Sequence, residues 1–287
     1  MTQLTDEQLQ KQVDAQLAQL DKLRNYDGDD KVISFPDLVT KLKDKIGYSF
    51  PCGIKDLDDL LRGFELGELV IISGPTKNGK TTFCQTITNG FSKQELKTLW
   101  FSFEMPMRQF LTGFRQIPEF AYAPQQLKNS TLLWIKSKIL EAIIKYDIKT
   151  VFIDHLGFVQ DLVRKEDRRG ELDVIVRAIK TMAIELDIVI FAVHHVRKLE
   201  PGTIPTFDDL KESSSVAQDA DKVLMLWREF ERGRRGEQTM TGQTILSIEL
   251  DRREGIYKKQ IKLQYYNKEF TPCETRYDER TYSPHKN

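Results

Sequence analysis

The residues whose types and spacing are best suited to chemistry lie in one short segment, Gly74-Pro75-Thr76-Lys77-Asn78-Gly79-Lys80-Thr81. It fills the template G-x-x-x-x-G-K-T and follows the apolar run Leu69–Ser73, which predicts a buried strand, and the residues after it predict a helix. A loop in this setting turns backbone N–H groups inward at the positive end of a helix dipole, which suits phosphate. Lys80 can then reach the outer phosphates, and the Thr81 hydroxyl can bind Mg²⁺. The segment, with Thr82 after it, therefore predicts a site for a nucleoside triphosphate and Mg²⁺.

Three more polar side chains stand where other predicted strands end. Asp154 ends an apolar run, and a carboxylate there suits a magnesium ligand better than a simple strand cap. Glu104 also ends a predicted strand and could orient and deprotonate the water that attacks a γ-phosphate. His195 follows a third strand and could contact that phosphate. Because adjacent residues on a strand point to opposite faces, His194 and His195 are not expected to share a metal, and we assign His194 to the core.

The composition sets limits on the class of protein. A chain of 287 residues with 40% hydrophobic residues can form one large domain or two small ones. Lys+Arg and Asp+Glu are both 43, which argues against a globally basic protein that coats DNA. Three cysteines without C-x-x-C spacing indicate neither a disulfide framework nor a zinc site. With no apolar signal region and no run of membrane-spanning length, the sequence predicts a cytoplasmic protein.

The middle of the chain alternates between strand and helix patterns. Predicted strands are Leu69–Ser73, Thr98–Phe103, Thr150–Asp154, Ile188–Val193 and Lys222–Trp227. Predicted helices are Thr82–Ser92, Met107–Phe114, Leu132–Tyr146 and Glu171–Leu186. This alternation predicts an α/β fold, a mostly parallel sheet with helices on both faces. Thr244–Leu250 and Gln260–Tyr266 alternate strictly around Arg252–Lys259 and predict an antiparallel C-terminal hairpin.

The front of the chain has a different pattern. Residues 5–25 carry a capping box and one narrow apolar stripe, which predicts an amphipathic helix that packs on its own domain or on another subunit. A polar, turn-rich linker, Asn25–Lys31, separates it from a second amphipathic segment, Ile33–Ile46.

Two loops offer cationic side chains for a polyanion. Gln160–Gly170 carries Arg164 and Lys165, and Arg197–Ser215 carries Lys211 and a run of serines. Such donors suit a phosphate backbone and need no base readout. Solvated surface charge is the alternative interpretation of both loops.

In this order the motifs resemble the RecA-like motor domain of the DnaB-type replicative helicases, including the helicase half of phage primase-helicases. The resemblance covers about Gly53–Thr271. Phe101–Pro106 is similar to the family's strand that ends in the catalytic glutamate, which supports Glu104 in that role. Phe152–His155 resembles the Walker B strand, and His195 takes the γ-phosphate sensor position. The resemblance thus implies a P-loop ATPase with ATP as its substrate.

The resemblance also implies roles for residues that their own spacing does not explain. The segment Asp209–Asp221 resembles the family's DNA-holding channel segment, which gives the DNA-contacting positions to Lys211, Glu212, Ser213 and Ser214. The family usually has arginine and glycine where this chain has Lys211 and Ser214. Arg228 and Tyr266 resemble residues on either side of the nucleotide base. Arg253, with Arg252 as the alternative, matches an arginine finger offered to a neighbouring subunit.

On this resemblance we expect a hexameric ring that moves along single-stranded DNA in replication, with ATP between subunits. The expected organisation is a helix and linker (1–32), a linker helix docked on a neighbouring subunit (33–52), the RecA-like ATPase domain (53–272) and a polar tail (273–287). The first helix would brace the ring or bind a primase, a polymerase or a loader. The alternatives are a recombinase or clock-type switch ATPase of the same fold, and a nucleotide-gated loader or adaptor that does not unwind DNA. The expected host is a bacterial cell, or one that carries a phage or plasmid.

Overall fold

The computed structural model describes residues 18–159, 168–197, 199, 203–210, 218–232 and 238–273. The chain divides into two units, Met1–Tyr48 and Ser49–Asn287, each of which is described by itself. Within the described ranges, no helix has the length and apolar character needed to cross a bilayer. Most of the predicted first helix, residues 5–17, lies outside the described residues.

The described part of the first unit contains a well-defined amphipathic helix. Residues 18–24 are helical, and helix α2 follows at Phe35–Leu42. The Ser34 hydroxyl accepts a hydrogen bond from the Asp37 amide at 3.2 Å and so caps α2. Phe35, Leu38, Val39 and Leu42 repeat at helical spacing, yet no residue of α2 is buried. The helix is shorter than the predicted segment, because residues 44–47 form turns instead.

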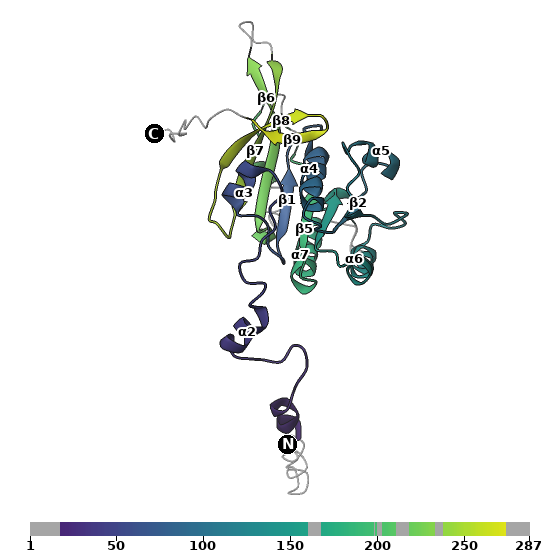
Figure 1. Ribbon diagram of the computed structural model, residues 1–287, viewed down its shortest axis with the longest axis vertical. Helices are drawn as coiled ribbons and strands as arrows, with labels where there is room; N and C mark the ends of the chain where they lie inside the picture. The colour runs from purple at the N-terminus through teal and green to yellow at the C-terminus, as the bar shows by residue number, and fades with distance from the viewer. Residues whose placement is uncertain are drawn as a thin grey trace, which may run out of the picture. The chain divides into compact units, whose positions relative to one another are not determined.

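The second unit is built on one mixed sheet with the strand order β3-β2-β4-β5-β1-β6-β7-β8-β9 among its described strands (Figure 1). The strands are β1 Leu69–Ser73, β2 Thr98–Ser102, β3 Ala121–Tyr122, β4 Thr150–Asp154, β5 Val189–Val193, β6 Lys222–Arg232, β7 Gln238–Asp251, β8 Lys259–Tyr266 and β9 Glu269–Pro272. From β3 to β6 every pair is parallel, and from β6 to β9 every pair is antiparallel. The predicted α/β fold with an antiparallel C-terminal part is confirmed.

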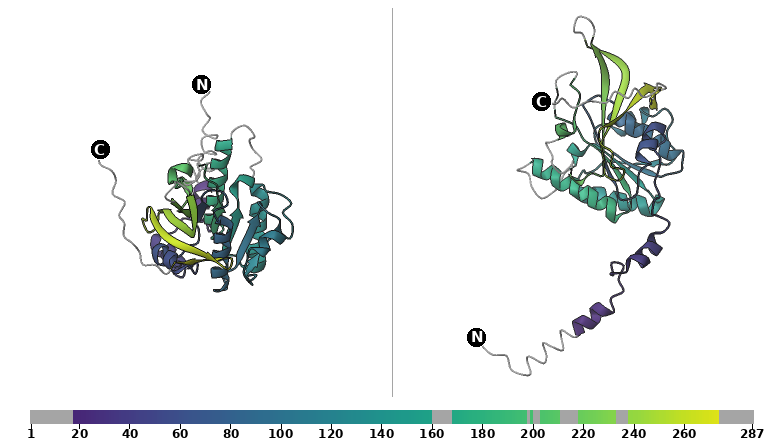
Figure 2. Two further views of the ribbon diagram at one scale, coloured as in Figure 1. Left: turned by 90° about the horizontal axis from the view of Figure 1, so that it is seen from above. Right: turned by 90° about the vertical axis from the view of Figure 1, so that its left-hand side faces the viewer.

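Helices cover both faces of the parallel strands (Figure 2). They are α3 Lys55–Leu61, α4 Lys80–Ser92, α5 Met107–Thr112, α6 Leu132–Tyr146 and α7 Arg168–Glu185, with short 3₁₀ turns η1 Leu156–Phe158 and η2 Phe207–Leu210. Residues of α3 and α4 pack with Val70 and Ile72 of β1, and residues of α6 and α7 pack with Leu69 and Ile71. Alternate residues of one fully buried strand thus supply both cores, which explains its continuous apolar run.

Stacked aromatic rings fix the register of three neighbouring strands on the α4 face. Trp100, Phe152 and Phe191 lie opposite one another on β2, β4 and β5. The ring centroids of the first pair are 4.6 Å apart and those of the second pair are 4.5 Å apart, with nearly parallel planes. Register matters for the site, because a shift would move the residues that follow each strand.

Some elements go beyond the sequence prediction. The strands β3 and β9 were not predicted, and β6 and β7 are longer than predicted and extend past the parallel strands (Figure 1). The second compact unit begins at Ser49. Phe50 belongs to it, because the backbone of Phe50 exchanges hydrogen bonds with Phe64 at 2.8 and 3.0 Å and its side chain is buried.

Candidate nucleotide-binding site

The carboxyl ends of β1, β2, β4 and β5 lie at the same edge of the sheet, because these strands are parallel. The loop 74–81 follows β1, Glu104 follows β2, Asp154 ends β4 and His195 follows β5. The fold therefore brings these predicted site residues to one edge, where ligands bind in open α/β sheets.

Two glycines allow the loop after β1 to take its shape. Gly74 has φ +136°, and a Cβ there would lie 2.0 Å from the carbonyl oxygen of Leu226 on β6. Gly79 has φ +89°, and a Cβ there would lie 2.9 Å from the Phe270 ring. Any other residue would be strained and would collide with the sheet. The loop thus leads directly into the N-terminus of α4 at Lys80.

The Lys80 ammonium is folded back onto its own loop. It donates hydrogen bonds to the carbonyl oxygens of Gly74 at 2.8 Å and Pro75 at 2.9 Å, and only 5% of the residue is exposed. Burial lowers the pKa of Lys80 to about 8, and the negative charges of Asp154 and Glu104 oppose that shift. A phosphate oxygen would replace these carbonyls as the partner of the ammonium and favour its charged form.

Asp154 lies at the end of β4, against the hydroxyl of Thr81. Its Oδ2 accepts a hydrogen bond from the Thr81 hydroxyl at 2.6 Å, and the residue is fully buried. Burial raises the pKa of Asp154 to about 6, partly opposed by the Thr81 hydrogen bond. Its Oδ1 is buried and has no hydrogen-bond partner within the described part of the chain. Such an orphaned carboxylate oxygen beside a hydroxyl fits Mg²⁺, which prefers oxygen ligands.

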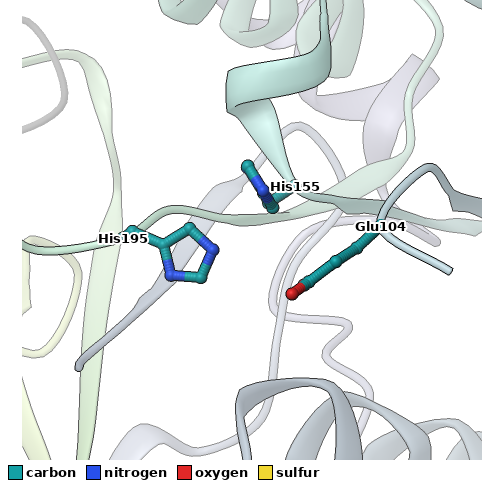
Figure 3. Close-up of side chains that lie close together, drawn as sticks. All are labelled: Glu104, His155 and His195. Atoms are coloured by element: carbon teal, nitrogen blue, oxygen red, sulfur yellow. The ribbon is translucent and has the colours of Figure 1, made fainter. Parts of the chain in front are cut away.

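Glu104, His155 and His195 converge beside this pair (Figure 3). One carboxylate or ring nitrogen atom from each lies within 4.8 Å of those of the other two. The rings of His155 and His195 meet edge to face, with centroids 4.4 Å apart. Burial lowers the pKa of His194 and of His195 to about 4, so the rings of these two residues are neutral near pH 7. The sequence assigned roles to Glu104 and His195 but none to His155.

The antiparallel strands contribute a cavity of 340 Å³ next to the loop. Its lining residues come from the loop, α4 and the strands β6 to β9: Asn78, Gly79, Thr82, Arg228, Gly242, Thr244, Tyr265 and Phe270. Asn78 joins the two sides, since its side-chain oxygen accepts a hydrogen bond from the Arg228 amide at 2.8 Å. The cavity has the size and position for a nucleotide base.

Tyr265, rather than the predicted Tyr266, lines this cavity. Adjacent residues of a strand face opposite sides, and Tyr265 lies opposite Phe270 on β9, with ring centroids 5.6 Å apart. Tyr266 lies opposite Glu269 and is 72% exposed. The family resemblance favoured Tyr266, and the sequence offered no check on that choice because β9, which sets the register, was not predicted.

The arginine pair lies at the other edge of the sheet. Arg252 and Arg253 follow β7, and the Arg252 amide donates to the carbonyl oxygen of Asp221 at 3.0 Å, just before β6. Arg253 donates to the carbonyl oxygens of Leu61 and Gly63. The structure therefore does not bring either arginine to the nucleotide site of its own chain.

The predicted DNA-contacting residues Arg164, Lys165, Lys211, Glu212, Ser213 and Ser214 lie outside the described residues. The structure does describe the chain just before the second group. There Asp209 is 5% exposed and binds the Arg197 guanidinium at 2.8 Å, as well as the Thr206 amide and hydroxyl.

A mostly parallel α/β sheet with a G-x-x-x-x-G-K-T loop after its central strand defines the class of P-loop nucleotide-binding proteins. Within this class, a model of the DnaB-like helicase C-terminal domain matches residues 49–117 and 114–272. The chain belongs to this family, and the predicted resemblance is confirmed.

Individual relatives agree with that assignment. A probable replicative DNA helicase of Trieres chinensis is 32% identical over 247 residues, which cover 72% of this chain and 54% of that protein. The chain spans about half the length of the curated relatives it matches.

Two solved structures share the fold. One, described as an ATPase domain, has a TM-score of 0.73 at 19% identity and covers 86% of this chain and 100% of that chain. A DnaB-like replicative helicase, described with its interactions with primase, has a TM-score of 0.70 at 18% identity and covers 91% of this chain and 72% of that chain. The RecA-like architecture predicted from the sequence is thereby confirmed.

Proposed function

We propose that this protein is an ATP-dependent DNA helicase that assembles as a ring and moves along single-stranded DNA during replication. Membership of the DnaB-like family supports the proposal. The observation that carries it is the hydrogen bond between Thr81 and the buried Asp154, beside Lys80. This hydrogen bond lies at the same edge of the sheet as Glu104 and His195. This set of groups matches what ATP hydrolysis requires.

Each group has a distinct task in this proposal. Lys80 exchanges its carbonyl partners for oxygens of the outer phosphates, and the loop amides bind the remaining oxygens. Thr81 and Asp154 would hold Mg²⁺, which would neutralise phosphate charge when it is bound. Glu104 orients a water molecule and takes its proton, and neutral His195 contacts the γ-phosphate.

The other nucleotide contacts follow the cavity. The base lies between Arg228 and the tyrosines of β8, where Tyr265 faces the cavity and Tyr266, the residue favoured by the family resemblance, points away from it. An arginine finger from the next subunit, Arg253 or Arg252, completes the site.

We assign DNA binding to the two cationic loops. Lys211, Glu212, Ser213 and Ser214 would hold the strand by its backbone, and Arg164 and Lys165 would add cationic contacts. The network of Asp209 with Arg197 and Thr206 supports this assignment, because it anchors the chain two residues before Lys211.

Ring assembly is assigned to α2. The helix exposes Phe35, Leu38, Val39 and Leu42, which together form an apolar face without a partner in its own described unit. We assign this face to a neighbouring subunit, so that 33–52 links ring members. The preceding helix is then free for a primase, a polymerase or a loader, in the cytoplasm of a bacterial cell or an infected host. A similar solved helicase is described with its interactions with primase, which favours primase among these.

Two substitutions at the site test the proposal. Lys80→Ala removes the phosphate contact and Glu104→Gln removes the base, so each should reduce DNA-stimulated ATP hydrolysis by at least about 100-fold. Strand displacement on a forked duplex should be lost in parallel. Lys145→Ala and Glu185→Gln are matched controls, since both side chains form exposed ion pairs on helices.

Three results would contradict the proposal. Near-normal turnover in Lys80→Ala or Glu104→Gln would rule out the assigned site. ATP turnover without strand displacement by the wild-type protein would instead favour a recombinase or switch ATPase. Absence of turnover, with or without DNA, would favour a nucleotide-gated adaptor.

A further inference from the structure

His155 lies between two groups of the proposed mechanism, although neither a sequence motif nor that mechanism gives it a task. It follows Asp154 directly, and its ring approaches both Glu104 and His195 (Figure 3). It therefore lies where the attacking water and the γ-phosphate would meet.

The turn after β4 fixes the orientation of this ring. The Gly157 amide donates a hydrogen bond to Nδ1 of His155 at 3.1 Å. A Cβ on Gly157 would lie 2.8 Å from Cε1 of the ring and 3.0 Å from Nδ1, so the ring rests directly against the glycine. Because Nδ1 accepts a hydrogen bond, the neutral ring carries its proton on Nε2. His155 thus carries an N–H donor on the nitrogen that Gly157 does not engage.

This hydrogen bond also decides between two uses of the cluster. Two histidines and a carboxylate can bind a transition metal, which needs a lone pair from each ring. With Nδ1 engaged by Gly157, the free nitrogen of His155 bears a proton instead. The geometry therefore favours hydrogen-bond donation to an anion over metal binding.

Glu104 is an anion that can accept a hydrogen bond from such a donor. It is exposed on the loop after β2, and its amide approaches the Asp154 carbonyl oxygen at 3.3 Å. Within the described part of the chain, no backbone or side-chain group donates a hydrogen bond to the Glu104 carboxylate. A general base must be held close to its water, and hydrogen bonds that are long without substrate often shorten when it binds.

We propose that His155 is a positioning residue for Glu104, whose carboxylate accepts a hydrogen bond from Nε2 of His155 and is thereby aimed at the attacking water. This inference rests on the proposed function, because it takes Glu104 as the base. The Gly157 amide in turn holds His155, so a short chain of hydrogen bonds runs from the η1 turn to the base.

Replacing His155 by an apolar ring and by an amide of similar reach tests this role. His155→Phe should lower kcat for ATP hydrolysis roughly 10- to 100-fold, as expected for a misplaced base, with KM changed less than about twofold. His155→Gln keeps a donor near the position of Nε2 and should recover most of the lost kcat. A normal kcat in His155→Phe, or a raised KM with kcat unchanged, would overturn the proposal.

A double-mutant cycle shows whether His155 acts through Glu104. Glu104→Asp withdraws the carboxylate by one methylene, so in that background His155→Phe should lower kcat little further. Fully additive losses would overturn the proposal. Gly157→Ala provides a second route should His155→Phe fold poorly in thermal unfolding. It displaces the ring without removing it and should lower kcat in the wild-type background only.

Glu104→Gln separates this inference from the proposed function. If Glu104→Gln keeps near-normal turnover, the base assignment itself is wrong and the inference falls with it. If Glu104→Gln is inactive while His155→Phe is normal, the proposed function stands and only the role of His155 is rejected.

Discussion

Lys80 shows how a single residue prepares the site before any ligand arrives. Its ammonium is almost fully enclosed and donates its hydrogen bonds to the Gly74 and Pro75 carbonyl oxygens. Burial brings its pKa from the ordinary 10.5 to about 8. Phosphate charge favours the protonated lysine, so the pKa must rise again when nucleotide binds.

This shift gives nucleotide binding a defined pH dependence. Above pH 8 the free protein loses the Lys80 proton, and binding has to take it up again. The Kd for ATP should therefore be about tenfold weaker at pH 9 than at pH 7, measured by calorimetry or fluorescence titration. Lys80→Arg stays charged throughout this range and reports any titration of the nucleotide itself. A wild-type Kd that is as flat as that of Lys80→Arg would contradict the pKa assigned to Lys80.

At the scale of elements, local patterns were sufficient for the fully buried parallel strands β1, β2, β4 and β5. The runs at β1 and β4 predicted their bounds because a strand buried on both faces has a nearly continuous apolar run. The loop 74–81 could also be predicted from the sequence, since its template and its flanking elements are contiguous. The two-residue strand β3 and the polar strand β9 carry no such pattern, so their existence depends on the neighbours with which they pair.

The same distinction explains which site residues the sequence could supply. Glu104, Asp154 and His195 stand at strand ends, where strand direction alone predicts convergence. His155 matters through the turn that orients its ring, and Tyr265 faces the cavity because of its pairing with Phe270. Both facts depend on contacts that no local pattern contains.

The exposed apolar face of helix α2 leads to a prediction about assembly. Phe35 is 83% exposed although it belongs to an apolar face, so we expect that face to be buried between ring members. The double substitution Phe35→Asp and Leu38→Asp should convert the oligomer to monomers, as measured by light scattering after gel filtration. Thr40→Asp adds charge to the opposite side of α2 and should leave the mass unchanged. A ring that survives the double substitution would rule out this role for α2.

At the scale of the whole molecule, the two ends of β1 have different tasks. Its carboxyl end leads into the phosphate loop, and its amino end lies beside Asp221 and the turn that carries Arg252 and Arg253. Five residues of strand place these edges roughly 13 Å apart along the strand direction. Arg253 is bound to carbonyl oxygens at the second edge, so neither end can complete the other within one subunit.

On the basis of this separation we propose that the arginine finger acts on a neighbouring subunit, and mixed rings can test this. Lys80→Ala subunits lack a working site but keep both arginines, and Arg253→Ala subunits keep the site but lack one finger candidate. Each variant alone should hydrolyse ATP poorly, whereas an equal, randomly assembled mixture should restore about one site in four.

Arg252→Ala mixed with Lys80→Ala is the matched experiment, and the arginine whose variant is inactive alone yet complemented in the mixture is the finger. Thermal unfolding of each variant checks that the lost contacts of Arg253 with Leu61 and Gly63 have not unfolded it. If both mixtures form rings of full mass and neither regains turnover, ATP hydrolysis does not depend on an arginine from the neighbouring subunit.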